Sequence, residues 1–195
     1  MPNHVTNIIT VDSMMEEISN KLYGNKNEDG EEVLVDFNKI KPLPKELIGT
    51  RSPGGQKEGE SDERYKEQVE NLIKKYRYSN WYDWKVANWG TKWNAYSISV
   101  GINYFKFQTA WDHPRLIVES LSSIFPTVRF EVKYADEDAG QNIGDYVMQN
   151  GDVLEDNELI EDMDRLQFAC DILDYDINDH LHGELEKEGT YNAKI

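Results

Sequence analysis

The sequence has only one cysteine, Cys170, so no disulfide can form within the chain. It contains no run of about 18 consecutive apolar residues, the length that a membrane-spanning helix needs. Its first ten residues, MPNHVTNIIT, have neither a basic region nor a long apolar run, as a secretion signal would. We therefore expect a soluble, cytoplasmic protein that does not interact with a membrane.

Basic residues are also scarce, with 21 Lys and Arg against 37 Asp and Glu, for a net charge of −16. This excess of acid argues against direct binding of nucleic acid, which uses extended basic surfaces. The imbalance is local: 152–189 holds fourteen acids and two bases, whereas 1–151 holds 23 acids and 18 bases. The charge is therefore a property of the C-terminal region.

The patterns that mark cofactor and catalytic sites are missing as well. Gly54-Gly55 is not followed by the Gly-Lys-Ser/Thr of a phosphate-binding loop. His180 and His182 stand two residues apart, which is not the one-turn spacing of a zinc pair, and no cysteine pair accompanies them. We expect no cofactor, no bound metal and no catalytic residue, and these absences favour a non-catalytic protein over an enzyme.

What the sequence does contain is an alternation of strand and helix patterns. Apolar alternation predicts strands, and apolar residues three and four apart predict helices. The expected strands are 4–11, 94–100, 104–109 and 128–135, with short candidates at 33–37 and 144–149, and the expected helices are 14–22, 61–76 and 115–125. Without the segment 25–88, the order is β-α-β-β-α-β, the split βαβ or ferredoxin-like arrangement of an α+β fold with an antiparallel sheet.

The chain is thus expected to have two parts. Residues 1–151 form the ferredoxin-like domain, with a helical insertion at about 25–88, and 152–195 form an acidic helical extension packed on it. Apolar residues in the extension are spaced for two helices that separate near 174–176. Their apolar stripe packs either on the domain or on a second copy, which would give a homodimer through the C-terminal helices.

Six segments in one order carry a family resemblance. They are MPNHVTNIITV at the start, 37–47 (FNKIKPLPKEL), 81–84 (WYDW), 88–95 (NWGTKWNA), 107–114 (FQTAWDHP) and 134–140 (YADEDAG). With these segments, the chain resembles the YubB ferredoxin-like family of phage and plasmid proteins, over roughly 1–151. The resemblance implies a ferredoxin-like fold and an origin in a phage or other mobile element. It implies no reaction.

Four of the five tryptophans lie within 81–93, which admits two interpretations. In the first, tryptophan faces stack on a flat ligand while a glycine allows close approach and a lysine holds a phosphate. In the second, the tryptophans anchor the insertion onto the sheet. The candidate binding residues are Trp89, Gly90, Thr91, Lys92, Trp93, Asn94 and Trp111.

Three further acids, Asp136, Glu137 and Asp138, end the strand predicted at 128–135. Carboxylates suit Mg²⁺ or Ca²⁺, so a metal-dependent enzyme that uses them is one alternative function. A solvated turn at the strand end is the other interpretation.

The acidic extension supports the leading hypothesis, a non-catalytic protein that binds and inhibits a host component, such as a CRISPR effector or another nucleic-acid-handling defence complex. An acidic surface can imitate a phosphate row and occupy a basic groove of a protein or protein–nucleic-acid complex. Alternatives are a solvated helical cap, and a binder that sequesters a nucleotide or other small molecule. The expected contact surface comprises Asp152, Glu155, Asp156, Glu158, Glu161, Asp162, Asp164, Asp171 and Asp174.

Overall fold

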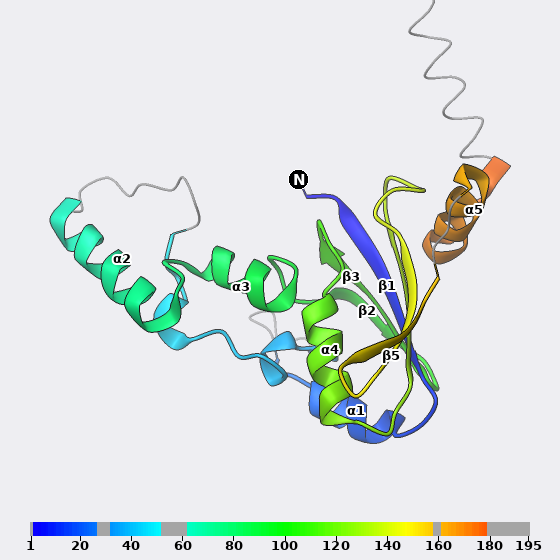
Figure 1. The fold of residues 1–195 in the computed structure, drawn as a ribbon, viewed down its shortest axis with the longest axis horizontal. Coiled ribbons are helices and arrows are strands. Elements are labelled where there is room, and N and C mark those ends of the chain that lie inside the picture. Colours follow the sequence, from blue (N-terminus) through cyan, green and yellow to red (C-terminus); the bar gives the residue numbers. More distant parts are fainter. Residues whose placement is uncertain (1, 27–31, 52–61, 158–160, 179–195) are drawn as a thin grey trace, which may run out of the picture.

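The computed structural model describes residues 2–26, 32–51, 62–157 and 161–178, and its centre is an antiparallel six-stranded sheet (Figure 1). The strand order is β2-β3-β1-β4-β5-β6. The strands are β1 (His4–Val11), β2 (Tyr96–Val100), β3 (Tyr104–Ala110), β4 (Phe130–Asp136), β5 (Gly144–Gln149) and β6 (Asp152–Asp156).

The ferredoxin-like prediction is confirmed. Helix α1 (Met15–Leu22) connects β1 toward β2, and α4 (Arg115–Ile124) connects β3 to β4, which gives β-α-β-β-α-β once the insertion is set aside. The long strand β1 pairs with both β3 and β4 along its length, so it lies at the centre of the four-stranded unit.

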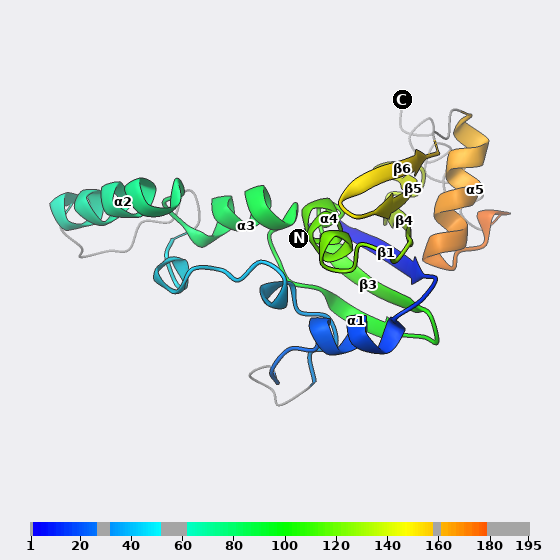
Figure 2. The ribbon, with the colours of Figure 1, turned by 60° about the horizontal axis from the view of Figure 1, so that its bottom comes forward.

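The main core lies between one face of the sheet and the helices α1 and α4. Alternation along the strands brings every second side chain to this face, because successive side chains of a strand point to opposite sides. Helix α5 (Asp162–Leu173) covers the other face, and Figure 2 shows α4 and α5 on opposite sides of the sheet. Buried residues of the main core include Ile9, Val11, Phe105, Phe107, Phe130, Val132, Ile18, Leu22, Ile117, Val118 and Leu121.

The C-terminal region differs from the expectation at its start. Asp152–Asp156, expected to be part of a helical extension, form the strand β6, which pairs with β5. The cause is the turn between them, because Asn150 and Gly151 both adopt positive φ angles, of 53° and 83°, as a two-residue hairpin turn requires. α5 then packs through Ala169 and Ile172 onto Ala135 of β4. The second expected helix falls almost wholly on 179–195, outside the described residues.

In its described residues, 25–26, 32–51 and 62–88, the insertion contains four helical segments and no strand. They are the 3₁₀ turns η1 (Phe37–Lys39) and η2 (Lys45–Leu47) and the helices α2 (Asp62–Tyr76) and α3 (Trp81–Trp89). The strand expected at 33–37 is wrong, because this segment makes backbone hydrogen bonds to Leu22 and Gly24, turns into η1 at its end, and joins no sheet. Figure 1 shows α2 projecting away from the sheet, with α3 between them. Among the described helices, none is long and apolar enough to cross a membrane.

Candidate functional site

Four of the seven candidate binding residues hold the insertion to the domain. Trp89 is fully buried, and its indole Nε1 donates a 2.8 Å hydrogen bond to the carbonyl of Lys41. Thr91 is also buried, and its hydroxyl donates to the carbonyl of Ala110 at 2.8 Å. These contacts favour the anchoring interpretation for this pair.

Gly90 and Asn94 have similar structural roles. Gly90 ends α3 with a φ of 88°, and a Cβ there would lie 3.0 Å from the carbonyl oxygen of His113. The side chain of Asn94 accepts a hydrogen bond from the backbone of Phe37 and donates one to Asp36. The turn that follows α3 is thus tied to both the insertion and the start of α4.

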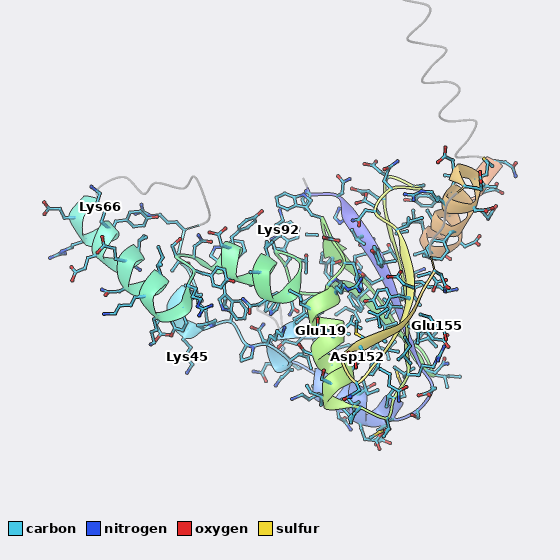
Figure 3. All side chains as sticks on the ribbon, in the orientation of Figure 1. Lys45, Lys66, Lys92, Glu119, Asp152 and Glu155 are labelled. Carbon is cyan, nitrogen blue, oxygen red and sulfur yellow. The ribbon has the colours of Figure 1, made fainter. Side chains whose placement is uncertain are left out.

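The other three residues form an exposed group, the tryptophan–lysine patch, made of Lys92, Trp93 and Trp111. The two indoles are 40% and 48% exposed. The Lys92 ammonium lies 4.4 Å from the ring centre of Trp93 and 3.7 Å from that of Trp111, which places it in cation–π contact with both. Figure 3 shows Lys92 beside α3. This patch is the accessible part of the expected binding platform.

The acids at the end of β4 have partners within the chain. Asp136 is buried, and its carboxylate accepts hydrogen bonds from the side chain of Asn3 and the backbone of Asp138, each at 3.0 Å. Glu137 accepts from the backbone of His4 at 3.1 Å. Across the described parts of the chain, no group of three or more His, Cys, Asp or Glu side chains is placed to hold a metal ion. His180 and His182 lie outside those parts.

The expected acidic surface is exposed wherever it is described. Every position of β6 is exposed, and Figure 3 shows Asp152 and Glu155 on this strand. Two of the acids form ion pairs with the domain, Glu155 with Arg129 and Asp174 with Lys106, both at 2.6 Å. Glu158 lies outside the described residues, and the others are Asp156, Glu161, Asp162, Asp164 and Asp171.

A buried polar network that sequence reasoning did not find crosses the core at His113. Its Nδ1 lies 2.7 Å from Oδ1 of Asn7, and its Nε2 lies 2.6 Å from the hydroxyl of Tyr146. The amide nitrogen of Asn7 already donates to Val5 and Thr109, so Oδ1 faces the histidine as an acceptor. His113 therefore donates from Nδ1, and Nε2 accepts the proton of Tyr146.

Burial keeps this histidine neutral. Loss of hydration, with a smaller effect from the positive charge of Arg115, lowers the pKa of His113 to about 3. Burial also raises the pKa of Tyr146, so that the phenol keeps its proton. The ring of Tyr134 stacks on His113 with centroids 4.4 Å apart and an interplanar angle of 5°. The network is thus rigid and uncharged at neutral pH.

A pocket of about 520 Å³ opens beside this network, at the end of the sheet. The domain and the C-terminal elements both supply walls, and the two sides meet at Tyr134 and Tyr146. No sequence motif indicated this pocket, because the residues that line it are far apart in the chain. The lining residues are Arg115, Tyr134, Ile143, Gly144, Tyr146, Asp156, Asn157 and Arg165.

One family model supports the ferredoxin-like fold. No curated protein matches the chain. Among solved structures, the crystal structure of a protein api92 from Yersinia pseudotuberculosis is similar at 18% identity, with a TM-score of 0.36, over 42% of this chain and 31% of that one. Residues 88–176, which include β6 and α5, match the family model described as the ferredoxin-like domain in Api92-like protein. The chain therefore contains a ferredoxin-like domain similar to that of Api92-like proteins.

Proposed function

We propose that the protein is a non-catalytic binding protein that blocks a nucleic-acid-handling component of a host cell, with its acidic surface in a basic groove of that partner. A defence complex such as a CRISPR effector is the expected class of target. The source in a phage or other mobile element is part of the proposal, and it is supported by the resemblance of the sequence to the YubB family.

The observation that carries this proposal is the exposure of the acids on β6 and α5. Within the described part of 152–178, acids outnumber bases nine to one. The two ion pairs are solvent-exposed, and such pairs contribute only about 0–1 kcal/mol each. Gathered like charges repel one another, so stability of the fold does not account for so many acids on this surface. It does suit a basic partner, whose approach it would accelerate.

The tryptophan–lysine patch offers a second contact surface. Exposed tryptophans are rare on free surfaces and frequent at the centres of protein interfaces. Trp93 and Trp111 are held in place by the lysine between them, so little side-chain entropy is lost on binding. An aromatic contact of this kind would add affinity that high salt does not remove.

The test compares two variants of equal charge. In one, Asp152, Asp162, Asp164 and Asp171 are changed to Asn. In the control, four exposed acids elsewhere are changed to Gln, namely Glu17, Glu67, Glu70 and Glu119. Each protein is used to capture partners from a host lysate at low and high salt, and captured proteins are then eluted with duplex DNA.

The proposal predicts that the wild type and the control capture the same nucleic-acid-binding protein, that duplex DNA displaces it, and that the Asp→Asn variant does not capture it. It is wrong if no partner is captured, or if capture is indifferent to salt, DNA and the four Asp→Asn changes.

A further inference from the structure

We propose that the pocket between the domain and its C-terminal elements binds a small phosphate monoester that also carries hydroxyl groups, such as a sugar phosphate or a mononucleotide. This site is separate from the tryptophan–lysine patch, and the proposal does not depend on the acidic surface having a partner. It gives β6 and α5 a second role, as walls of a ligand site.

The charges of the pocket favour an anion. Among the described residues that line it, Arg115 and Arg165 carry positive charge and Asp156 carries negative charge, in a chain of net charge −16. The Arg115 guanidinium lies 5.1 Å from the ring centre of Tyr146, and no carboxylate of the described residues is within ion-pair distance of it. Guanidinium groups bind phosphate through charge-assisted hydrogen bonds, which are among the strongest in proteins.

The positions of both arginines are defined by the fold. Arg115 is the first residue of α4, directly after His113 and Pro114. Arg165 lies on α5, and its Nε and Nη2 donate to the carbonyl of Gly140 at 3.3 and 3.0 Å. The two positive charges therefore come from opposite faces of the sheet and meet at the pocket.

The floor of the pocket is preorganised. Tyr146 is only 2% exposed and is held by its hydrogen bond to His113, while Tyr134 is held by stacking on the same histidine. Gly144 makes room for this arrangement, because a Cβ there would lie 2.3 Å from the ring of Tyr134. A ligand would meet side chains that are already ordered, so binding would cost little conformational entropy.

Size and polarity argue for more than a bare phosphate. A volume of about 520 Å³ falls within the range of small-molecule sites, and an inorganic ion would leave most of it empty. Asp156 would repel a second anionic group, but its carboxylate can accept hydrogen bonds from hydroxyl groups, as can the carbonyl of Asn157. An anion at the arginines and hydroxyl groups at Asp156 would satisfy both ends of the pocket.

The experiment is calorimetric titration of the full chain with ribose 5-phosphate and AMP, alongside inorganic phosphate, ribose and citrate. We expect saturable binding of at least one phosphate ester, with inorganic phosphate weaker and ribose silent. Arg115→Gln should weaken that binding roughly tenfold or more, the effect of losing one charge-assisted hydrogen bond. The control, Arg64→Gln, makes the same charge change at an exposed position of α2 and should leave affinity unaltered.

A further variant tests the orientation of the ligand. Asp156→Asn should weaken binding of the phosphate ester and leave the affinity for inorganic phosphate equal or higher. Only the ester has sugar hydroxyl groups that donate hydrogen bonds to the Asp156 carboxylate. The proposal is overturned if neither ester binds, if citrate binds better than both, or if Arg115→Gln and Arg64→Gln behave alike. A failed titration would not contradict the proposed capture of a host partner, because the four Asp→Asn changes of that test include no residue that lines the pocket.

Discussion

The hydroxyl of Tyr146 lies 2.6 Å from Nε2 of His113, inside the core of a ferredoxin-like domain. The two residues come from different structural units, the start of α4 and the added strand β5. The bond therefore connects the β-α-β-β-α-β unit to β5, and through it to β6. Protonation of His113 would reverse the donor and acceptor roles in this bond and place a charge in the core. Several properties of the protein should depend on it.

The first is stability in acid. The pKa of His113 is lowered from 6.5 to about 3 by burial, so the unfolded chain binds a proton at this residue over a pH range in which the folded chain does not. The contribution of His113 to stability is therefore fully present above about pH 6.5 and is lost as the pH falls toward about 3. Urea unfolding at a series of pH values measures this decrease.

The variant His113→Gln supplies the comparison. It should be less stable than the wild type near neutral pH, because it loses the stacked ring and leaves polar groups of Asn7 and Tyr146 without their partner. Between about pH 6.5 and 5, however, its stability should change less with pH. Equal slopes for the two proteins in this range would show that His113 titrates normally.

The second prediction concerns Gly144. Ala at this position would bring a Cβ to 2.3 Å from Cε1 of Tyr134, and the ring would have to leave its place on His113. We expect Gly144→Ala to destabilise the protein by about 1–3 kcal/mol, the usual cost of overpacking. The measurement is urea unfolding of a double-mutant cycle with Tyr134→Ala, in which the cost of Gly144→Ala should largely disappear. A cost that persists in the Tyr134→Ala background would place its cause in the backbone.

The fold was predictable because it follows from local patterns. The eight residues of β1 are predicted to the residue, and the helix after Pro114 begins where proline in a first turn places it. Two further local signals indicate elements that were not predicted, the strand β6 and the helix α3. The sequence Asn150-Gly151 is a hairpin signal, and it makes β6 a strand. Asn80 and Gly90 cap the helix α3, whose many aromatic residues obscured its periodicity.

The pocket was not predictable in the same way. Its lining residues are spread over Arg115 to Arg165 and come from α4, β4, β5, β6 and α5, so no short motif contains them. Their meeting depends on the pairing of β5 with β4, and on the packing of α5 against the opposite face. Likewise, Trp89 and Trp93 are four residues apart in one aromatic-rich segment, and the tertiary structure buries the first and leaves the second 40% exposed.

The third prediction concerns the difference in exposure among the tryptophans. Trp84 and Trp89 are at most 9% exposed, whereas Trp93 and Trp111 are 40% and 48% exposed. A neutral quencher such as acrylamide should therefore act mainly on the latter pair. The double variant Trp93→Phe/Trp111→Phe should lose most of the quenchable fluorescence, while Trp89→Phe should lose little. A quenching curve that the double variant leaves unaltered would mean that the patch is covered, for example by a second copy.

The fourth prediction uses Cys170 to report on the attachment of α5. The thiol is fully buried on the helix that covers the second face of the sheet. Burial raises its pKa, and the charges of Asp171 and Asp176 raise it further, so the reactive thiolate is disfavoured on two counts. At neutral pH, DTNB should react with the native protein far more slowly than with the chain in denaturant.

The variant that tests this attachment is Ile172→Ala. Ile172 packs beside Ala169 onto Ala135, and loss of such a side chain costs about 2–5 kcal/mol, so α5 should open more often and the rate should rise at least roughly tenfold. Leu121→Ala removes a buried side chain from α4 instead and lowers the stability of the whole domain. If α5 opens alone, only Ile172→Ala accelerates the thiol reaction; if both variants accelerate it equally, α5 separates from the sheet only when the domain unfolds, and the pocket is as stable as the fold itself.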